Sequence, residues 1–317
     1  GLLRDADVRR LPEAGGADRV TVAFAALAIF VLLGLTAGAV YLADDLTRCR
    51  RRRVQGSPAD LGLRYEEVQF LTADRLTLRG WFLESPGARA AIVLVHDLEA
   101  TRADVDRRLM DLARDYVRRG YSVFTFDLRG HGESGGVHDT LGRDESLDVA
   151  AAVRCVHRRA PGVPVILHGF GFGAAVSLAA VADRAEVAAV VADSAFPTMR
   201  EYLHARWRWL PSPVLTVVGR VARRLYGADI DALRPVAVVN RVGVPVLYIH
   251  NQDDPLLPPS CTLNLAAASL DARDRVWIAA GHGHATGYRE APDTYLRRVV
   301  EFYEHVIPAR VLAARAV

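Results

Sequence analysis

The chain has 317 residues, of which 51% are hydrophobic and 24% are charged, a composition typical of a folded globular protein. This composition excludes wholesale disorder, a collagen-like repeat and a small disulfide-stapled scaffold. All 40 basic residues are arginine and stand against 37 acidic residues, so the net charge of +3 does not indicate a nucleic-acid-binding surface. The three cysteines, Cys49, Cys155 and Cys261, form no C-x-x-C pair and predict neither a disulfide framework nor a zinc site.

One long uncharged stretch lies near the start of the chain. Residues 20–43 comprise 24 residues without a charge and would form a helix of roughly 36 Å, enough to cross a hydrocarbon core of ~30 Å. The alternatives are a buried core helix and a cleaved signal peptide. A signal peptide has a shorter apolar region of ~7 to 15 residues, and here residues 1–19 carry as many acids as arginines. We therefore predict one transmembrane helix that anchors the protein in membrane lipid.

Arginines on either side of this segment bear on its orientation. Arg4, Arg9, Arg10 and Arg19 precede it, whereas an arginine-rich linker predicted at residues 44–60 follows it. The excess after the helix favours a cytoplasmic soluble domain. The run at residues 48–53 would be either a solvated linker or a contact with anionic lipid headgroups. Beside the membrane, Cys49 is expected to be an ordinary free thiol rather than an acylation site.

The remainder of the chain alternates short apolar runs with longer segments of helical periodicity, which is typical of a parallel α/β sheet. We expect eight strands, of which the first two form an antiparallel hairpin. The predicted strands are 65–71, 76–83, 91–95, 122–126, 163–167, 187–192, 244–249 and 276–279. The predicted helices are 104–119, 143–159, 174–182, 260–270 and 293–306.

Residues 197–235 interrupt this alternation and predict a small helical cap within a soluble domain at 61–307, which is followed by a tail at 308–317. Aromatic side chains of the cap, such as Trp207 and Trp209, would pack against the sheet or line a ligand pocket. The two glycines of a G-x-x-x-G pair, Gly34 and Gly38, would allow a close contact with a membrane-protein partner.

Polar and glycine-rich loops follow several of the predicted strands, where ligands bind in open α/β sheets. The loop after residues 91–95 begins His96-Asp97-Leu98, and the loop after 122–126 reads D-x-R-G-x-G-x-S from Asp127 to Ser134. The next informative loop reads G-F-G-F-G at residues 169–173. The last two contain Asp253-Asp254 and G-H-G-H at residues 281–284.

In their order and positions these five motifs resemble the α/β-hydrolase superfamily, in particular its esterase, lipase and serine-peptidase-like branches, over nearly all of residues 61–307. The resemblance implies an α/β-hydrolase fold, with an eight-stranded mostly parallel sheet, helices on both faces and a small helical cap. It also implies a triad in the order nucleophile, acid, histidine. The acid would be Asp254 and the base His284, and the backbone N–H groups of Leu98 and Phe172 would form the oxyanion hole. The resemblance implies no cofactor and no metal.

The resemblance fails at the nucleophile. In the G-x-S-x-G elbow the serine position is occupied by Gly171, which has no oxygen with which to attack. Loss of the triad serine costs about 10⁶-fold in kcat in comparable enzymes. The oxyanion loop departs too, because the family usually has His-Gly where this chain has His96-Asp97. A carboxylate at Asp97 would oppose negative charge developing on a substrate oxygen.

Other side chains could replace the missing nucleophile or bind a metal. Ser194 follows a strand in a D-S-x-F context, and the resemblance implies a structural role for this serine. Neither Ser134 nor Ser177 lies on an elbow. The spacing of three histidines fits no zinc pattern. These histidines are His131, His138 and His282.

Three interpretations follow. The favoured one is a membrane-anchored pseudohydrolase that acts as a binding, scaffolding or regulatory module, with an ester-like small molecule or a lipid as ligand. The second is an active serine-hydrolase-like esterase, lipase or peptidase with an unconventional nucleophile, or a chain whose natural serine at 171 has been replaced. The third is a subunit of a membrane complex. Gly171→Ser should restore reactivity if the pocket is otherwise intact, and failure would implicate Asp97.

Overall fold

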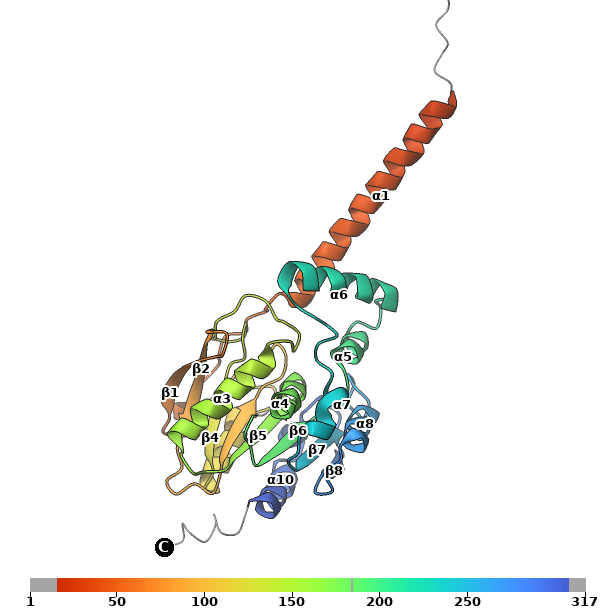
Figure 1. The fold of residues 1–317 in the computed structure, drawn as a ribbon. Coiled ribbons are helices and arrows are strands. Elements are labelled where there is room, and N and C mark those ends of the chain that lie inside the picture. Colours follow the sequence, from red (N-terminus) through yellow and green to blue (C-terminus); the bar gives the residue numbers. More distant parts are fainter. Residues whose placement is uncertain (1–15, 184, 308–317) are drawn as a thin grey trace, which may run out of the picture.

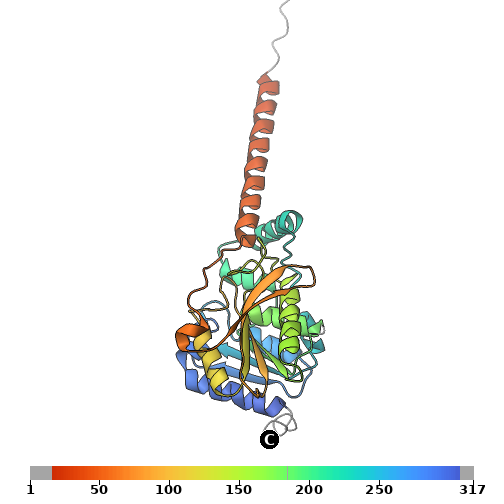
Figure 2. The same ribbon diagram turned by 90° about the vertical axis from the view of Figure 1, so that its left-hand side faces the viewer.

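The structure is a computed structural model that describes residues 16–183 and 185–307. Residues 1–15 of the N-terminal flank predicted at 1–19, and the tail predicted at 308–317, lie outside the described residues. Figures 1 and 2 show a long N-terminal helix that projects from an α/β body.

The body is built on an eight-stranded sheet in the order β1-β2-β4-β3-β5-β6-β7-β8. The strand β2 runs antiparallel to both of its neighbours, and the pairs from β4 to β8 are all parallel. The eight-stranded, mostly parallel sheet expected from the sequence is confirmed. The strands are β1 (Glu66–Leu71), β2 (Thr77–Leu83), β3 (Ala91–Val95), β4 (Ser122–Phe126), β5 (Val165–Phe170), β6 (Ala189–Asp193), β7 (Val246–Asn251) and β8 (Arg275–Ala279).

Burial along the strands explains their sequence patterns. Every residue of β3, β4, β5, β6 and β7 is buried, because helices cover both faces of the central sheet, and most residues in each of these strands are apolar. At the edge, β1 alternates buried Val68 and Phe70 with exposed neighbours, as a strand with one solvated face does.

Helices pack on both faces of the sheet and form two cores. One core contains α3 and α4 together with the cap helices and α8, and the other contains α2, α9 and α10. These helices are α2 (Leu109–Arg118), α3 (Glu145–Arg159), α4 (Phe172–Ala182), α7 (Pro235–Val238), α8 (Ser260–Ala268), α9 (Gly287–Glu290) and α10 (Pro292–Val306). Two short 3₁₀ turns, η1 (Pro58–Leu61) and η2 (Val239–Arg241), complete the element order.

The N-terminal helix α1 (Gly16–Thr47) has 32 residues and is longer than predicted at both ends. Its segment Arg19–Thr47 has a mean hydropathy of 2.5 in its most apolar window, and that window is exposed throughout. By length and composition, α1 could cross a membrane. Its last residues, including Ala43 and Leu46, are instead buried against the body.

Arginines of the predicted linker are largely bound to the protein itself. Arg51 donates to the backbone carbonyl oxygens of Gly132 at 3.1 Å and Ser134 at 2.7 Å, and Arg52 forms an ion pair with Asp106 at 2.8 Å. Within the same segment, Cys49 is half-buried, and its Sγ donates to Asp139 at 3.7 Å. Burial and the Asp139 carboxylate raise the pKa of this thiol, which disfavours the reactive thiolate.

The predicted cap consists of α5 (Met199–Arg206) and α6 (Ser212–Tyr226). Thr198 begins α5 by accepting a hydrogen bond from the N–H of Glu201, and Gly227 ends α6 in the left-handed conformation. Trp207 packs against the core, whereas Trp209 is exposed.

Candidate active site

A carboxylate–histidine pair lies beyond the carboxyl ends of β7 and β8. His284 Nδ1 donates to Asp254 Oδ2 at 2.7 Å. The other carboxylate oxygen of Asp254 accepts the backbone N–H groups of Leu256 at 2.8 Å and Leu257 at 3.1 Å, which fixes the acid in place. The neighbouring Asp253 is exposed and faces His282. The structure therefore brings together the predicted acid and base.

The surroundings of this pair favour its charged form. Burial opposes ionisation of Asp254, but hydrogen bonds from His250 and His284 outweigh it and hold the pKa of Asp254 well below its usual range. Burial likewise opposes a charge on His284, but the hydrogen bond with Asp254 and the negative charge of Asp97 raise its pKa. An imidazole whose pKa is raised retains its proton to higher pH, so a smaller fraction is neutral and able to act as a general base at a given pH.

Gly171 occupies the turn between β5 and α4, where the sequence predicted the elbow. Its φ of 51° and ψ of −112° lie in a region that non-glycine residues enter only under strain of about 1 to 3 kcal/mol. The turn is tight because the backbone at Gly173 approaches β3, where an added Cβ would lie 2.8 Å from the carbonyl carbon of Val95. The elbow conformation is therefore retained although its side chain is absent.

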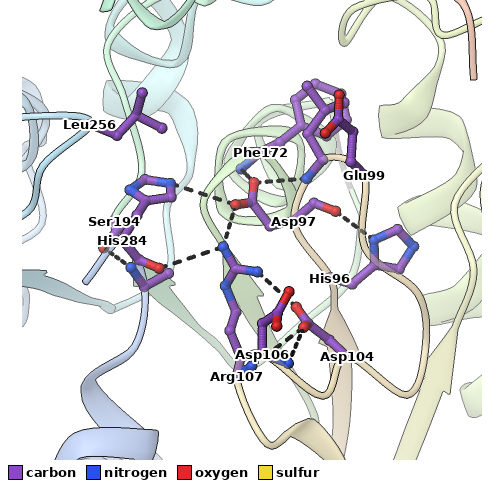
Figure 3. Close-up of polar contacts among 12 residues, drawn as sticks. His96, Asp97, Glu99, Asp104, Asp106, Arg107, Phe172, Ser194, Leu256 and His284 are labelled. Atoms are coloured by element: carbon purple, nitrogen blue, oxygen red, sulfur yellow. Dashed lines mark hydrogen bonds and ion pairs between the residues drawn. The ribbon is translucent and has the colours of Figure 1, made fainter. Parts of the chain in front are cut away.

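The carboxylate of Asp97 lies in front of this elbow and binds both predicted oxyanion donors. Its Oδ1 accepts the backbone N–H of Leu98 at 2.8 Å and that of Phe172 at 2.7 Å (Figure 3). In an acyl-transfer enzyme these two groups would stabilise the substrate's oxyanion. Here a side chain of the protein already supplies the negative oxygen.

The second carboxylate oxygen of Asp97 lies between two basic side chains. Its Oδ2 accepts from Arg107 Nη2 at 2.6 Å and lies 3.6 Å from His284 Nε2. Arg107 also binds Asp104 at 2.8 Å, so the guanidinium joins two buried carboxylates. Burial opposes the charge on Asp97, but Arg107, His284 and the two backbone donors prevail and lower its pKa. Asp97 is therefore ionised in the folded protein at neutral pH.

Gly171 and Asp97 are sterically coupled. A Cβ at position 171 would lie 2.5 Å from Asp97 Cγ, a separation that real Cβ atoms essentially never show. Any side chain at the elbow thus requires Asp97 to move.

The loop that carries Asp97 is fixed by two histidines. His96 is fully buried; its Nδ1 donates to the carbonyl oxygen of Asp97 at 2.7 Å, and its Nε2 accepts the N–H of Leu128 at 3.0 Å. His131, in the D-x-R-G-x-G-x-S loop, accepts the N–H of Glu99 at 3.1 Å. Burial and the neighbouring His131 lower the pKa of His96 to about 4, which keeps it neutral.

The three serines considered as substitutes all have structural partners. Ser134 donates to the carbonyl oxygen of Asp127 at 2.6 Å, and Ser177 donates to that of Gly173 at 2.6 Å. Ser194 is buried with a φ of 57°, donates to Asp193 at 3.0 Å and accepts the N–H of Ala285 at 3.1 Å. Ser194 thereby fixes the loop that carries His284.

Of the three histidines weighed as metal ligands, His131 is buried in the loop contact above, His138 contacts the ring of Tyr226 in a tilted arrangement, and His282 is exposed beside Asp253. Within the described residues, no group of three or more His, Cys, Asp or Glu side chains could hold a metal ion.

A cavity of about 250 Å³ opens over the site. Its lining combines apolar groups with arginines and acids. The side chains around it include Arg52, Asp97, Leu98, Glu99, Asp106, Arg107, Tyr202, Arg206, Leu256 and His284.

Two arginines at this site carry no motif and were missed from the sequence. Arg107 lies in a segment predicted as regular helix, and its contact with Asp97 depends on a turn that precedes α2. Arg206, the last residue of α5, binds Glu99 of the oxyanion loop at 2.8 Å and ties the cap to it. An acidic residue in the oxyanion loop was the one available signal that a cation would be needed nearby.

This sheet, with an elbow after β5, an acid after β7 and a histidine after β8, defines an α/β-hydrolase, as the motifs predicted. The profile of the family described as serine aminopeptidase, S33 matches residues 86–282. The chain belongs to that family.

Relatives agree with this assignment. The chain is 30% identical to the Bacillus subtilis protein YqkD over 200 residues, covering 60% of this chain and 65% of YqkD. It is 26% identical to alpha/beta hydrolase domain-containing protein 17C of Xenopus tropicalis over 231 residues, covering 71% of this chain and 64% of that protein. These matches span just under two thirds of the relatives' own length.

Among solved structures, the Pyrococcus furiosus esterase Pf2001 superposes with a TM-score of 0.70 at 22% identity, covering 82% of this chain and 99% of that one. At this identity the likeness establishes the fold.

Proposed function

We propose that this protein is a membrane-anchored pseudohydrolase that binds a ligand or partner and does not catalyse acyl transfer. One observation carries the proposal: Asp97 Oδ1 accepts both backbone N–H groups that would otherwise stabilise a substrate oxyanion. The helix α1 supplies the proposed anchor, with the body proposed to lie on the cytoplasmic side.

Each step of serine-hydrolase chemistry meets an obstacle in this arrangement. Gly171 provides no attacking oxygen. A substrate carbonyl that entered the oxyanion hole would have to displace a carboxylate, and its developing charge would face Asp97 rather than free donors. His284, whose pKa is raised, is neutral in a smaller fraction of molecules at a given pH and is therefore less available to accept a proton. The three effects act on different steps, so relief of one alone would not restore turnover.

The cavity supports a binding role. Arg52, Arg107 and Arg206, each paired with a carboxylate of the same lining, lie beside Tyr202 and Leu256, so the cavity offers ion-paired polar groups and apolar contacts together. This lining fits a small ester-like or lipid molecule with a polar head and an apolar portion. In the scaffolding form of the same proposal, a membrane-protein partner would contact the side of α1 that bears Gly34 and Gly38.

The test is the reactivity of the full chain in detergent or bilayers. We expect no labelling by a fluorophosphonate probe and no hydrolysis of short acyl esters. Esterase turnover that His284→Ala abolishes would overturn the proposal.

A second candidate is a hydrolase in which Asp97 itself attacks. The observation in its favour is that His284 Nε2 faces Asp97 Oδ2 at 3.6 Å and, among the described residues, has no hydrogen-bond partner. Attack by Oδ2 on an acyl carbon would break the ester C–O bond and form an anhydride, while protonated His284 would give its proton to the departing alkoxide. The neutral His284 would then take a proton from water, which would cleave the anhydride to the free acid and regenerate the Asp97 carboxylate. Acid quenching followed by intact-mass measurement would detect that anhydride, and Asp97→Asn would abolish it.

A further inference from the structure

The cap helix α6 lies across the end of the N-terminal helix, on the side of the body from which α1 projects. Figures 1 and 2 both place α6 against the base of α1, and the two helices pack on each other. The contact involves the last part of α1, where Ala43 and Leu46 are buried in the same core as Leu215 and Val218 of α6.

This contact sets the level of α6 relative to the apolar part of α1. The uncharged stretch of α1 ends at Ala43, and Asp44 and Asp45 follow directly. In a bilayer spanned by α1, that transition would lie at the boundary between hydrocarbon and headgroups. Tyr41, which is 70% exposed, lies one turn earlier, at the depth where aromatic side chains favour a membrane interface. Because α6 packs against this end of α1, it occupies the same level.

The outer surface of α6 has an apolar stripe. Val214, Val217, Val221 and Leu225 recur at spacings of three and four residues, and therefore share one side of the helix. Val214, Val217 and Leu225 are exposed, whereas Val221 is partly buried against the core and the neighbouring side of the helix packs on the body. Outside α1, ten large apolar side chains of the described residues are exposed, and four of them lie between residues 209 and 225. This clustering separates α6 from the scattered exposed apolar residues of an ordinary surface.

The charges around the stripe have one sign. Residues 207–226 contain Arg208, Arg220, Arg223 and Arg224 and no acidic residue, and all four arginines are exposed. By helical spacing, Arg220 and Arg224 border the stripe on the side away from the body. An exposed apolar stripe flanked by arginines is typical of a helix that lies in a membrane interface, where arginines contact anionic headgroups.

We infer that α6 is a second membrane contact, whose stripe inserts into the headgroup–acyl boundary of the bilayer that α1 spans. The inference rests on the proposed anchoring by α1. Lipid is favoured over a protein partner because α6 packs against the end of the apolar α1, only arginines flank the stripe within residues 207–226, and Trp209, which is 69% exposed, precedes the helix. The contact would also hold the cap close to the membrane, since α5 and α6 are joined by five residues.

The experiment places a fluorescent NBD probe on single cysteines of the full chain in vesicles of phosphatidylglycerol and phosphatidylcholine. In a Cys49→Ser background, whose remaining cysteines are buried, the probe sites are Val217→Cys on α6, Leu32→Cys on α1 and Leu270→Cys on the body. Leu270 is 80% exposed and lies in the turn before β8. A spin-labelled lipid quenches probes that touch the bilayer.

We expect the probe at position 217 to be quenched at least half as strongly as that at position 32, with position 270 at the background level. Quenching at 32 with position 217 at background would overturn the inference while the anchor stands. Background quenching at both 32 and 217 would remove the anchor and the inference together.

Charge provides a second arm. Arg220→Gln combined with Arg224→Gln should reduce quenching at position 217 severalfold in anionic vesicles. The matched control, Arg297→Gln with Arg298→Gln, makes the same charge change on α10 at the far end of the body. This control should leave the quenching at position 217 unchanged. Equal effects of the two pairs would contradict a contact at α6.

Discussion

The two halves of the candidate site differ in what they retain. The half formed by the loops after β7 and β8 keeps the Asp254–His284 hydrogen bond of 2.7 Å, with backbone donors that fix the acid. The half formed after β3 and β5 keeps its backbone, including the elbow at Gly171, but its reactive positions are filled by Asp97. His284 therefore has a carboxylate on each side of its ring, Asp254 at Nδ1 and Asp97 at Nε2.

The largest expected effect comes from reversing both changes in the second half. Asp97→Gly combined with Gly171→Ser should free the oxyanion donors and supply a nucleophile beside His284. We expect fluorophosphonate labelling to appear and ester hydrolysis to rise by about 10²- to 10³-fold over the parent chain, a fraction of the ~10⁶ that a complete triad supplies.

Single variants sharpen that comparison. Gly171→Ser alone should remain unlabelled, because its Cβ would collide with Asp97. Adding His284→Ala to the double variant should remove the gain. If Gly171→Ser alone reacted as fast as the double variant, Asp97 would not block the site.

The next effect is on stability. Asp97→Ala removes a carboxylate that binds two backbone donors and the buried Arg107, and should lower the free energy of unfolding by about 2 to 4 kcal/mol. Urea unfolding of the full chain in detergent would measure it. The control, Asp231→Asn, breaks an exposed pair with Arg200 and should cost no more than about 1 kcal/mol. Similar losses of unfolding free energy in the two variants would show that the interactions of Asp97 contribute no more to stability than an exposed ion pair does.

A smaller effect concerns the titration of His284. Because its pKa is raised, its contribution to stability is complete below about pH 6.5, its unfolded value, and is lost as the pH rises through the folded value. Asp97→Asn removes one of the neighbouring charges and should lower the pKa of His284. Histidine NMR signals, assigned with His284→Gln, would show this, and an unchanged pKa would indicate that Asp97 does not act on the imidazole.

The smallest effect is expected at Ser194. Ser194→Ala removes the acceptor for the N–H of Ala285 and should cost about 1 kcal/mol, measured by thermal unfolding. When it is added to the Asp97→Gly, Gly171→Ser double variant, the Ser194→Ala substitution should leave fluorophosphonate labelling intact. Complete loss of labelling with the fold preserved would assign Ser194 a part in the chemistry.

The sequence predicted the fold because each strand is a short apolar run between helical segments, and β3 and β4 were placed at their observed bounds. The carboxyl ends of strands β5, β6 and β7 extend three, one and two residues further than predicted. Their carboxyl ends contain residues such as Gly169, Asp193 and Asn251, which are not strongly apolar but still pair in the sheet, as Gly169 does with Val95. Hydrophobicity therefore predicts the apolar part of a buried strand better than it predicts the carboxyl end, where the site residues lie.

The start of α2 was predicted five residues too early for a similar reason. Asp104 accepts the N–H groups of Asp106 at 3.1 Å and Arg107 at 3.3 Å, and so closes a turn where periodicity suggested helix. That turn directs Arg107 toward Asp97. The position of Asp97 beside the oxyanion donors followed from the motif. The hydrogen bond from the N–H of Phe172 to Asp97 could not be predicted, because the two residues are 75 positions apart and meet only through the pairing of β3 and β5.

The close approach of Asp97 to Gly171 also bears on how this chain can evolve. A serine regained at position 171 meets the carboxylate, while loss of the carboxylate first leaves Arg107 without its partner and still provides no nucleophile. Under the proposed function, each single substitution toward a serine hydrolase carries a cost without restoring the chemistry, so selection acting on one mutation at a time would tend to preserve the present pair.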